Sequence, residues 1–313
     1  MRFLSKRGKR ILLAVLLLVP LLWIGGDYLY SRLVAGHVAK WEASLQRNPL
    51  GIQLGAASRT LPGDSETALV LVHGFNDTPQ AFERMAPALQ ESGLTVRLVR
   101  LPGFGVPLPE MRECTRSQWI EAVLRETTAL QKDHSRVILA GHSLGAAVVI
   151  AAVLRDPAAA DGLVLLAPAI DVSSRRSPLM PTRAWHSLAD RLLIFSDVLI
   201  SPFDKNDARD PAVRNPAYKP SFSTRNVIRQ TLQLMAENRD QASGIHLPLL
   251  MFVSRTDQVV DWVAAERFFE ATASPVRELV FLDDSGHALN VDRDWPTVVS
   301  EMVQFINGLP PDE

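Results

Sequence analysis

A serine interrupts an apolar segment near the middle of the chain. Residues 137–152 read VILAGHSLGAAVVIAA, in which His142 and Ser143 are the polar pair. With Gly141 and Gly145 on either side, the run fits the pattern G-x-S-x-G, in which a sharp turn from a strand into a helix exposes the serine hydroxyl. The N-terminus of the helix that follows stabilises negative charge nearby. We therefore predict that Ser143 is a nucleophile.

A general base for Ser143 should follow it in the chain, because enzymes with this turn carry the nucleophile, the acid and the histidine in that order. Three of the seven histidines follow Ser143. His186 lies in a long insertion, and His246 precedes a predicted strand. His287 lies in FLDDSGHALNVD, just after the last predicted strand, where a base could reach the serine from the carboxyl edge of a sheet. We predict His287 as the base.

The acid that orients this histidine is predicted at Asp257. The segment LLMFVSRTDQVVD places Asp257 in the loop that follows a buried strand. Its carboxylate would hold the tautomer of the imidazole and stabilise the imidazolium. Asp261 on the following helix and Asp284 beside His287 are the alternatives, and capping of a helix is the structural alternative for Asp257.

Two backbone N–H groups should stabilise the oxyanion that forms during attack. The first is that of Leu144, directly after the serine. The second is that of Phe75 in LVHGF, where Gly74 allows a tight turn. His73 in the same segment is predicted to be a structural hydrogen-bonding residue.

Alternating strands and helices are predicted to position these residues. The alternation gives a mostly parallel sheet with helices on both faces, an α/β fold, over residues 67–170 and 246–313. The predicted strands are ALVLVHGF, LTVRLVRLPG, SRVILAG, GLVLLAPAI, HLPLLMFVS and RELVFLDD.

The alternation stops over residues 171–245, which we interpret as a helical lid inserted before the strand that carries the acid. Helices are predicted near Thr182–Ile200 and Arg225–Asn238. Because ligands of open α/β sheets bind beyond the carboxyl ends of the strands, the insertion should cover the site. Its apolar residues pack the lid onto the body or line an acyl pocket: Trp185, Leu188, Leu192, Leu193, Phe195 and Ile200.

The first thirty residues are predicted to be a membrane anchor or signal segment. Residues 11–26 are apolar and uncharged, and Trp23 is among the aromatic residues near the end of this stretch. We favour an uncleaved anchor over a removed signal, because Ile24 and Val34 occupy the −3 positions of the possible cleavage sites. A buried soluble helix is the third possibility. Five cations precede the stretch: Arg2, Lys6, Arg7, Lys9 and Arg10.

Positive charge stays on the cytoplasmic side, so the catalytic domain is predicted on the non-cytoplasmic side, at the periplasmic face of the inner membrane if the source is bacterial. Residues 31–66 are predicted to be a stalk and linker.

The composition excludes two classes of feature. The formal net charge is −1, so it indicates no nucleic-acid partner. Cys114 is the single cysteine, which permits no intrachain disulfide.

The motifs together resemble the α/β-hydrolase superfamily, and specifically its lid-bearing carboxylesterase and monoacylglycerol lipase-like branch. HGF, LPGFG, GHSLG, RTDQVVD and SGH occur in the expected order over residues 68–308. The resemblance implies the α/β-hydrolase fold, a triad of Ser143, Asp257 and His287, and no metal or cofactor. Phe104 is a departure, because members of this branch often have LPGHG.

The predicted function is a serine hydrolase that cleaves carboxylic esters, such as monoacylglycerol or lysophospholipid, through an acyl-enzyme intermediate. A serine peptidase, a thioesterase or an acyltransferase would use the same residues and is the alternative. A non-catalytic, membrane-tethered binding protein is the further alternative.

Overall fold

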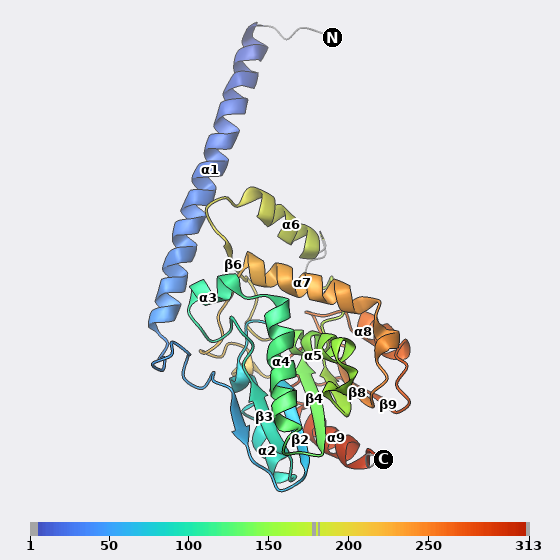
Figure 1. Ribbon diagram of the computed structural model, residues 1–313. Helices are drawn as coiled ribbons and strands as arrows, with labels where there is room; N and C mark the ends of the chain where they lie inside the picture. The colour runs from blue at the N-terminus through green and yellow to red at the C-terminus, as the bar shows by residue number, and fades with distance from the viewer. Residues whose placement is uncertain (1–5, 177–179, 181, 311–313) are drawn as a thin grey trace.

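The computed structural model describes residues 6–176, 180 and 182–310. Arg2 and the other residues before Lys6 in the predicted anchor, and residues 177–179 and 181 of the predicted lid, lie outside the described residues. The chain forms a body of sheet and helices, from which one long helix extends (Figure 1).

A mostly parallel sheet of seven strands runs through the described part of the body. The strand order is β1-β3-β2-β4-β5-β8-β9, and every pair is parallel except β1 with β3. The central strands are Val- and Leu-rich and buried on both faces, as expected for a parallel sheet covered by helices. The bounds are β1 (Arg59–Leu61), β2 (Thr67–Val72), β3 (Thr95–Val99), β4 (Arg136–His142), β5 (Gly162–Leu166), β8 (Leu249–Ser254) and β9 (Arg277–Leu282).

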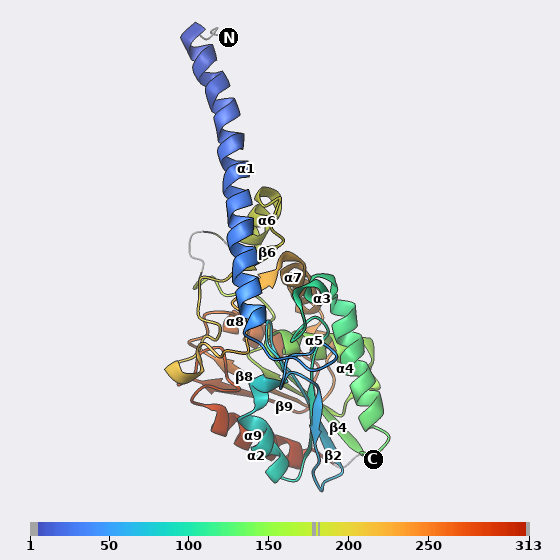
Figure 2. The ribbon, with the colours of Figure 1, turned by 90° about the vertical axis from the view of Figure 1, so that its left-hand side faces the viewer.

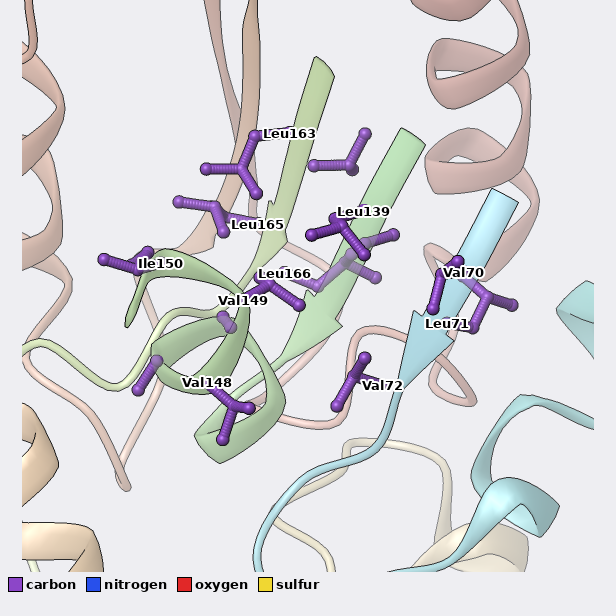
Figure 3. Close-up of a cluster of buried hydrophobic side chains, with 14 of the residues drawn as sticks. Val70, Leu71, Val72, Leu139, Val148, Val149, Ile150, Leu163, Leu165 and Leu166 are labelled. Atoms are coloured by element: carbon purple, nitrogen blue, oxygen red, sulfur yellow. The ribbon is translucent and has the colours of Figure 1, made fainter. Parts of the chain in front are cut away.

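Helices cover both faces of this sheet. α2 packs against α9 on one face and α4 packs against α5 on the other (Figure 2). Apolar side chains of α5 and of strands β2, β4 and β5 meet in the core (Figure 3). The prediction of a mostly parallel sheet with helices on both faces is therefore confirmed. The bounds are α2 (Met85–Glu91), α3 (Leu108–Glu113), α4 (Arg116–Leu130), α5 (Leu144–Arg155), α8 (Trp262–Glu270) and α9 (Trp295–Gly308).

The predicted lid lies between β5 and β8, and its described residues contain two α-helices, the short 3-10 helices Pro211–Val213 and Ala242–Gly244, and a two-stranded ribbon. We call β6 (Val198–Ile200) and β7 (Phe222–Thr224) the lid ribbon; they pair antiparallel. The α-helices are α6 (Thr182–Leu192) and α7 (Arg225–Arg239).

The helix predicted over Thr182–Ile200 is wrong beyond Leu192. The chain leaves the helix there because the backbone N–H groups of Ile194 and Phe195 donate to the carboxylate of Asp27 in the N-terminal helix. The residues that follow then form β6, whose backbone groups bond to β7 instead of to a further helical turn.

Two further elements differ from the sequence-based expectation. The N-terminal helix α1 (Lys6–Ala43) is continuous across residue 30, where we expected the anchor to end. β1 forms within the predicted linker and adds an antiparallel edge strand to the sheet. With three residues, β1 is too short to give a periodic signal in the sequence.

Candidate active site

Ser143, His287 and Asp257 form one chain of hydrogen bonds at the carboxyl edge of the sheet. Ser143 follows β4, Asp257 follows β8 and His287 follows β9. The Ser143 Oγ lies 2.8 Å from His287 Nε2, and His287 Nδ1 lies 2.7 Å from Asp257 Oδ2. All three residues are buried. The structure therefore brings together the three residues that the sequence placed in separate loops.

The turn at Ser143 has the strained backbone of a sharp passage from a strand into a helix. Its φ is 55° and its ψ is −113°, outside the regions that a residue with a side chain prefers. The flanking glycines make the turn possible. A Cβ on Gly141 would lie 2.4 Å from the nitrogen of Ala146, and a Cβ on Gly145 would lie 2.1 Å from the carbonyl oxygen of Val72.

The carboxylate of Asp257 is held in place by the backbone of its own loop. Its Oδ1 accepts hydrogen bonds from the N–H groups of Val259 and Val260 at 2.7 and 2.9 Å. Its Oδ2 is left for His287 Nδ1. In the tautomer whose Nδ1–H donates a hydrogen bond to the carboxylate, Nε2 carries a lone pair and can accept from the serine hydroxyl.

The two alternative acids lie elsewhere. Asp261 caps helix α8, where its carboxylate accepts from the N–H of Val263. Asp284 is exposed on the surface. The geometry therefore favours Asp257 as the partner of His287.

The segment around Gly74 lies directly against the serine. A Cβ on Gly74 would lie 3.0 Å from His142 Nδ1 and 3.3 Å from the Cβ of Ser143, so this close approach favours glycine. Phe75 lines the same cavity as Ser143. Leu144 is the first residue of α5, and N–H groups in the first turn of a helix have no acceptor within the helix.

His73 joins this segment to the neighbouring loop. Its Nε2 accepts from the N–H of Leu101 at 3.1 Å, and its Nδ1 donates to the carbonyl of Gly74 at 2.9 Å. Burial lowers the pKa of His73 to about 4, so the ring is neutral at pH 7. Phe104 packs edge-on against the His73 ring, with a centroid distance of 5.4 Å. An aromatic ring thus fills the position in which LPGHG sequences have histidine.

His142 contacts the backbone of His287. Its Nε2 donates to the backbone carbonyl of His287 at 2.9 Å. Burial and the neighbouring His287 lower the pKa of His142 to about 3. The ring is therefore a neutral contact that holds the His287 loop against the serine turn.

Two aspartates near the site were not predicted from the sequence. Asp207 comes from the lid, and its Oδ2 accepts from the N–H of Gln258 at 2.9 Å and from the N–H of His287 at 3.3 Å. Asp292 accepts from the N–H groups of Arg209 and Gly286 at 2.7 and 2.8 Å. Both lie in loops without periodicity, so no sequence signal distinguishes them from ordinary surface aspartates.

A cavity of about 160 Å³ lies beside Ser143 and His287. Charged side chains from the lid reach it, among them Arg176, Lys205 and Lys219. Lys219 Nζ lies 2.9 Å from Asp77 Oδ2, and burial together with Lys219 lowers the pKa of Lys205. The lid therefore gives the cavity a polar wall.

The apolar lid residues predicted to pack onto the body or line an acyl pocket do not line this cavity. Trp185, Leu188, Leu192 and Phe195 are exposed on the outside of the molecule, whereas Leu193 and Ile200 are half-buried.

Cys114 is buried, and burial raises the pKa of its thiol to about 11. Among the described residues, no group of three His, Cys, Asp or Glu side chains is arranged to hold a metal ion.

Comparison with known proteins relates most of the chain to hydrolases. Residues 63–294 match the family model described as serine aminopeptidase, S33. A thermostable monoacylglycerol lipase from Bacillus sp. (strain H-257) is 27% identical over 237 residues, which cover 76% of this chain and 89% of the lipase. A carboxylesterase from Bacillus subtilis (strain 168) is 20% identical over 248 residues, which cover 78% of this chain and 94% of the esterase.

Solved structures share the fold. A structure from work on LipS and LipT, two metagenome-derived lipolytic enzymes, has a TM-score of 0.73 at 22% identity and covers 82% of this chain and 100% of its own. A soluble variant of monoglyceride lipase from Saccharomyces cerevisiae, in complex with a substrate analogue, has a TM-score of 0.71 at 18% identity, with coverages of 86% and 96%.

These matches confirm the prediction of a lipase- and esterase-like serine hydrolase with the α/β-hydrolase fold. The family model extends from before β2 to the residue before α9 and includes Ser143, Asp257 and His287. The chain therefore belongs to the serine aminopeptidase S33 family of α/β-hydrolases.

Proposed function

We propose that the protein is a membrane-anchored serine esterase that cleaves acyl esters such as monoacylglycerol or lysophospholipid. The observation that carries this proposal is the hydrogen-bonded chain from Ser143 through His287 to Asp257. The names of the lipase and esterase relatives support an ester as the substrate.

The first half of the reaction acylates the serine. His287 Nε2 takes the proton as Ser143 Oγ attacks the acyl carbonyl carbon, and the carbonyl oxygen becomes an oxyanion. The N–H groups of Phe75 and Leu144 donate to that oxyanion. Asp257 stabilises the imidazolium, which then gives its proton to the departing alcohol. This step leaves the acyl group on the serine.

Water completes the cycle. His287 Nε2 takes a proton from a water molecule as its oxygen attacks the acyl-enzyme carbonyl, and the same oxyanion donors act again. Collapse of the intermediate returns the proton to Ser143 and releases the carboxylic acid. The net reaction converts an ester and water into an alcohol and a carboxylic acid.

The membrane part of the proposal rests on α1. Between residues 7 and 43 the helix is long and apolar enough to cross a bilayer. The aromatic residues Trp23 and Tyr28 lie near the end of the apolar run, and its cations precede it. We propose residues 1–30 as an uncleaved anchor, 31–66 as a stalk and linker, and 171–245 as the lid, with the catalytic domain on the non-cytoplasmic side. Alkaline phosphatase fused to the C-terminus should be active, because its disulfides form only outside the cytoplasm, and an intact fusion without activity would contradict this orientation.

Ester cleavage is tested with the full chain in detergent micelles. We expect hydrolysis of p-nitrophenyl esters, compared from acetate to palmitate, to fall by at least about 10⁴-fold in Ser143→Ala, because the nucleophile is removed. Ser92→Ala changes an exposed serine at the far end of α2 and is the matched control. The preferred chain length then reports the depth of the acyl pocket.

The family description makes aminopeptidase activity the second candidate. Release of the amine from a proline anilide, together with no hydrolysis of any ester by the folded chain, would replace the esterase proposal by a peptidase. Release of free coenzyme A from an acyl thioester, again without ester hydrolysis, would indicate a thioesterase.

A further inference from the structure

The lid helix α6 turns its apolar side away from the protein. Trp185, Leu188 and Leu192 follow one another at helical spacing and are 48%, 39% and 44% exposed. The polar residue His186 is instead buried, with its Nε2 3.2 Å from the carbonyl of Arg225. A surface helix in water normally buries its apolar stripe, so the orientation of α6 is the reverse of the usual one.

The exposed apolar surface continues past the end of this helix. The segment from Leu193 to Phe195, which we call the lid turn, contains Ile194 at 57% and Phe195 at 50% exposure. Together with the α6 stripe it gives five exposed apolar residues between Trp185 and Phe195. Patches of this kind mark a surface that contacts a protein or a membrane.

The lid turn is attached to the N-terminal helix. Trp23 Nε1 donates to the carbonyl of Leu192 at 2.8 Å, and Asp27 Oδ2 accepts from the N–H groups of Ile194 and Phe195 at 2.6 and 3.1 Å. The rings of Tyr28 and Phe195 meet edge to face at 5.9 Å. Figures 1 and 2 both show α6 beside the middle of α1, below the free N-terminal part of that helix.

A second set of contacts fixes the direction of α1 on the body. Val34 and Val38 are buried against the lid ribbon, in a small cluster with Val198 and Phe222. Trp41 packs edge-on against Phe222, with a centroid distance of 5.2 Å. The lower half of α1 is thus a packed part of the domain, and its upper half is exposed on all sides.

The length of a membrane span sets the depth of the lid turn. A hydrocarbon core of about 30 Å requires about 20 helical residues, so a span that begins at Ile11 ends at about residue 30. Trp23 and Asp27 lie before that point. The residues bound to them, Leu192 to Phe195, therefore lie beside the last turns of the span, at the boundary between the hydrocarbon core and the headgroups, where Trp23 also fits.

We propose that the outer face of α6 and the lid turn insert into the same bilayer that α1 spans, so that anchor and lid form one membrane-docking surface. The proposal rests on the proposed membrane anchor. The partner is the phospholipid bilayer. The helix that holds the lid turn, α1, continues toward its N-terminus as the apolar run of residues 11–26, which is proposed to span that bilayer. An acyl substrate would then reach the lid from the lipid phase.

The test measures contact with acyl chains directly. Full chains with single changes Leu188→Cys, Leu17→Cys or Val276→Cys are labelled with an environment-sensitive fluorophore and placed in phosphatidylcholine vesicles that contain lipids brominated on the acyl chains. Val276 matches Leu188 in exposure, at 39%, and directly precedes β9, at the amino end of this edge strand and opposite the carboxyl edge that the lid contacts. The unchanged chain controls for labelling of the buried Cys114, whose thiol has a raised pKa.

We expect bromolipid to quench the probes at 17 and 188 at least about twofold and to leave the probe at 276 unchanged. Quenching at 17 alone would overturn insertion of the lid and leave the anchor intact. Quenching at neither position would overturn both. None of these readings depends on catalysis, so a failure of the esterase proposal is distinguished by the p-nitrophenyl assay.

A kinetic measurement separates docking from folding. Leu188→Glu should lower hydrolysis of a long-chain ester embedded in vesicles by about tenfold and leave hydrolysis of soluble p-nitrophenyl butyrate unchanged. An equal loss on both substrates, or a loss on neither, would contradict the proposal.

Discussion

At the scale of single residues, burial decides the charge state of the imidazoles around the serine. His73 and His142 are both fully enclosed, and desolvation lowers their pKa values to about 4 and about 3. Each neutral ring bonds to a backbone group, His73 to Leu101 and His142 to the carbonyl of His287. Neutral rings make these contacts without placing a positive charge beside His287.

These two rings predict a loss of stability in acid. Their folded pKa values lie below the unfolded value of 6.5, so their contribution is present above pH 6.5 and is lost as the pH falls toward 4 and 3. Between pH 7 and 5 the free energy of unfolding should fall by about 2 kcal/mol for each histidine. Denaturant titrations of the full chain in detergent measure this loss.

The variant His142→Gln measures how much of this loss of stability in acid comes from His142. The amide of glutamine can still donate to the His287 carbonyl but does not titrate, so about half of the pH-dependent loss should disappear. His246→Gln changes an exposed histidine and is the control. The same loss in His142→Gln as in the unchanged chain would contradict the assignment.

At the scale of elements, the lid segment that contains Asp207 connects the two loops that follow β8 and β9. Its carboxylate accepts from Gln258 in one loop and from the N–H of His287 in the other, and its carbonyl accepts from Ala288 at 3.0 Å. Arg176 lies 3.3 Å from the same carboxylate. The segment around Asp207 therefore ties the loop of Asp257 to the loop of His287.

We predict that Asp207→Ala lowers kcat about 10- to 100-fold with a smaller change in KM, because small displacements of catalytic groups cost about this much. Steady-state kinetics on p-nitrophenyl butyrate measure it. Asp210→Ala, three residues on, removes a carboxylate that caps Pro211–Val213 and serves as the matched control. A loss confined to KM would mean that Asp207 acts in substrate binding alone.

At the scale of the whole molecule, the N-terminal helix, the lid and the serine turn are joined by a series of contacts. α1 holds the lid turn through Asp27 and the lid ribbon through Val34 and Val38. The ribbon is joined to the segment after Gly74, because Asn76 Nδ2 donates to the carbonyl of Phe222 at 2.8 Å. Removal of the first thirty residues would therefore also remove support from the lid.

Asp27→Ala tests this support. The substitution leaves the N–H groups of Ile194 and Phe195 without their carboxylate acceptor, and the loss of a buried hydrogen bond of this kind costs about 1–3 kcal/mol. Hydrogen exchange of peptides that cover Ile194–Ile200 should accelerate about tenfold or more. Asp64→Ala, on the exposed loop before β2, should change nothing there. Unchanged exchange in Asp27→Ala would show that the lid turn is held by other contacts.

The local features of the sequence determined the sheet and the loops of the candidate site. Strands β2 to β9 of the main sheet are apolar runs bounded by turn residues, and such runs fold into buried parallel strands because helices cover both faces. Ser143, Asp257 and His287 each follow one of these runs, so their arrangement at one edge could be predicted.

Tertiary structure alone decided the parts that depend on distant partners. β1 is too short to show a period, and the helix beginning at Thr182 stops at Leu192 because Asp27, 167 residues away from Ile194, accepts from the backbone there. The outward direction of Trp185 and the contacts of Asp207 are likewise set by distant parts of the chain. An amphipathic stripe and a loop aspartate are visible in the sequence, but which surface each one faces is set by the elements packed around it.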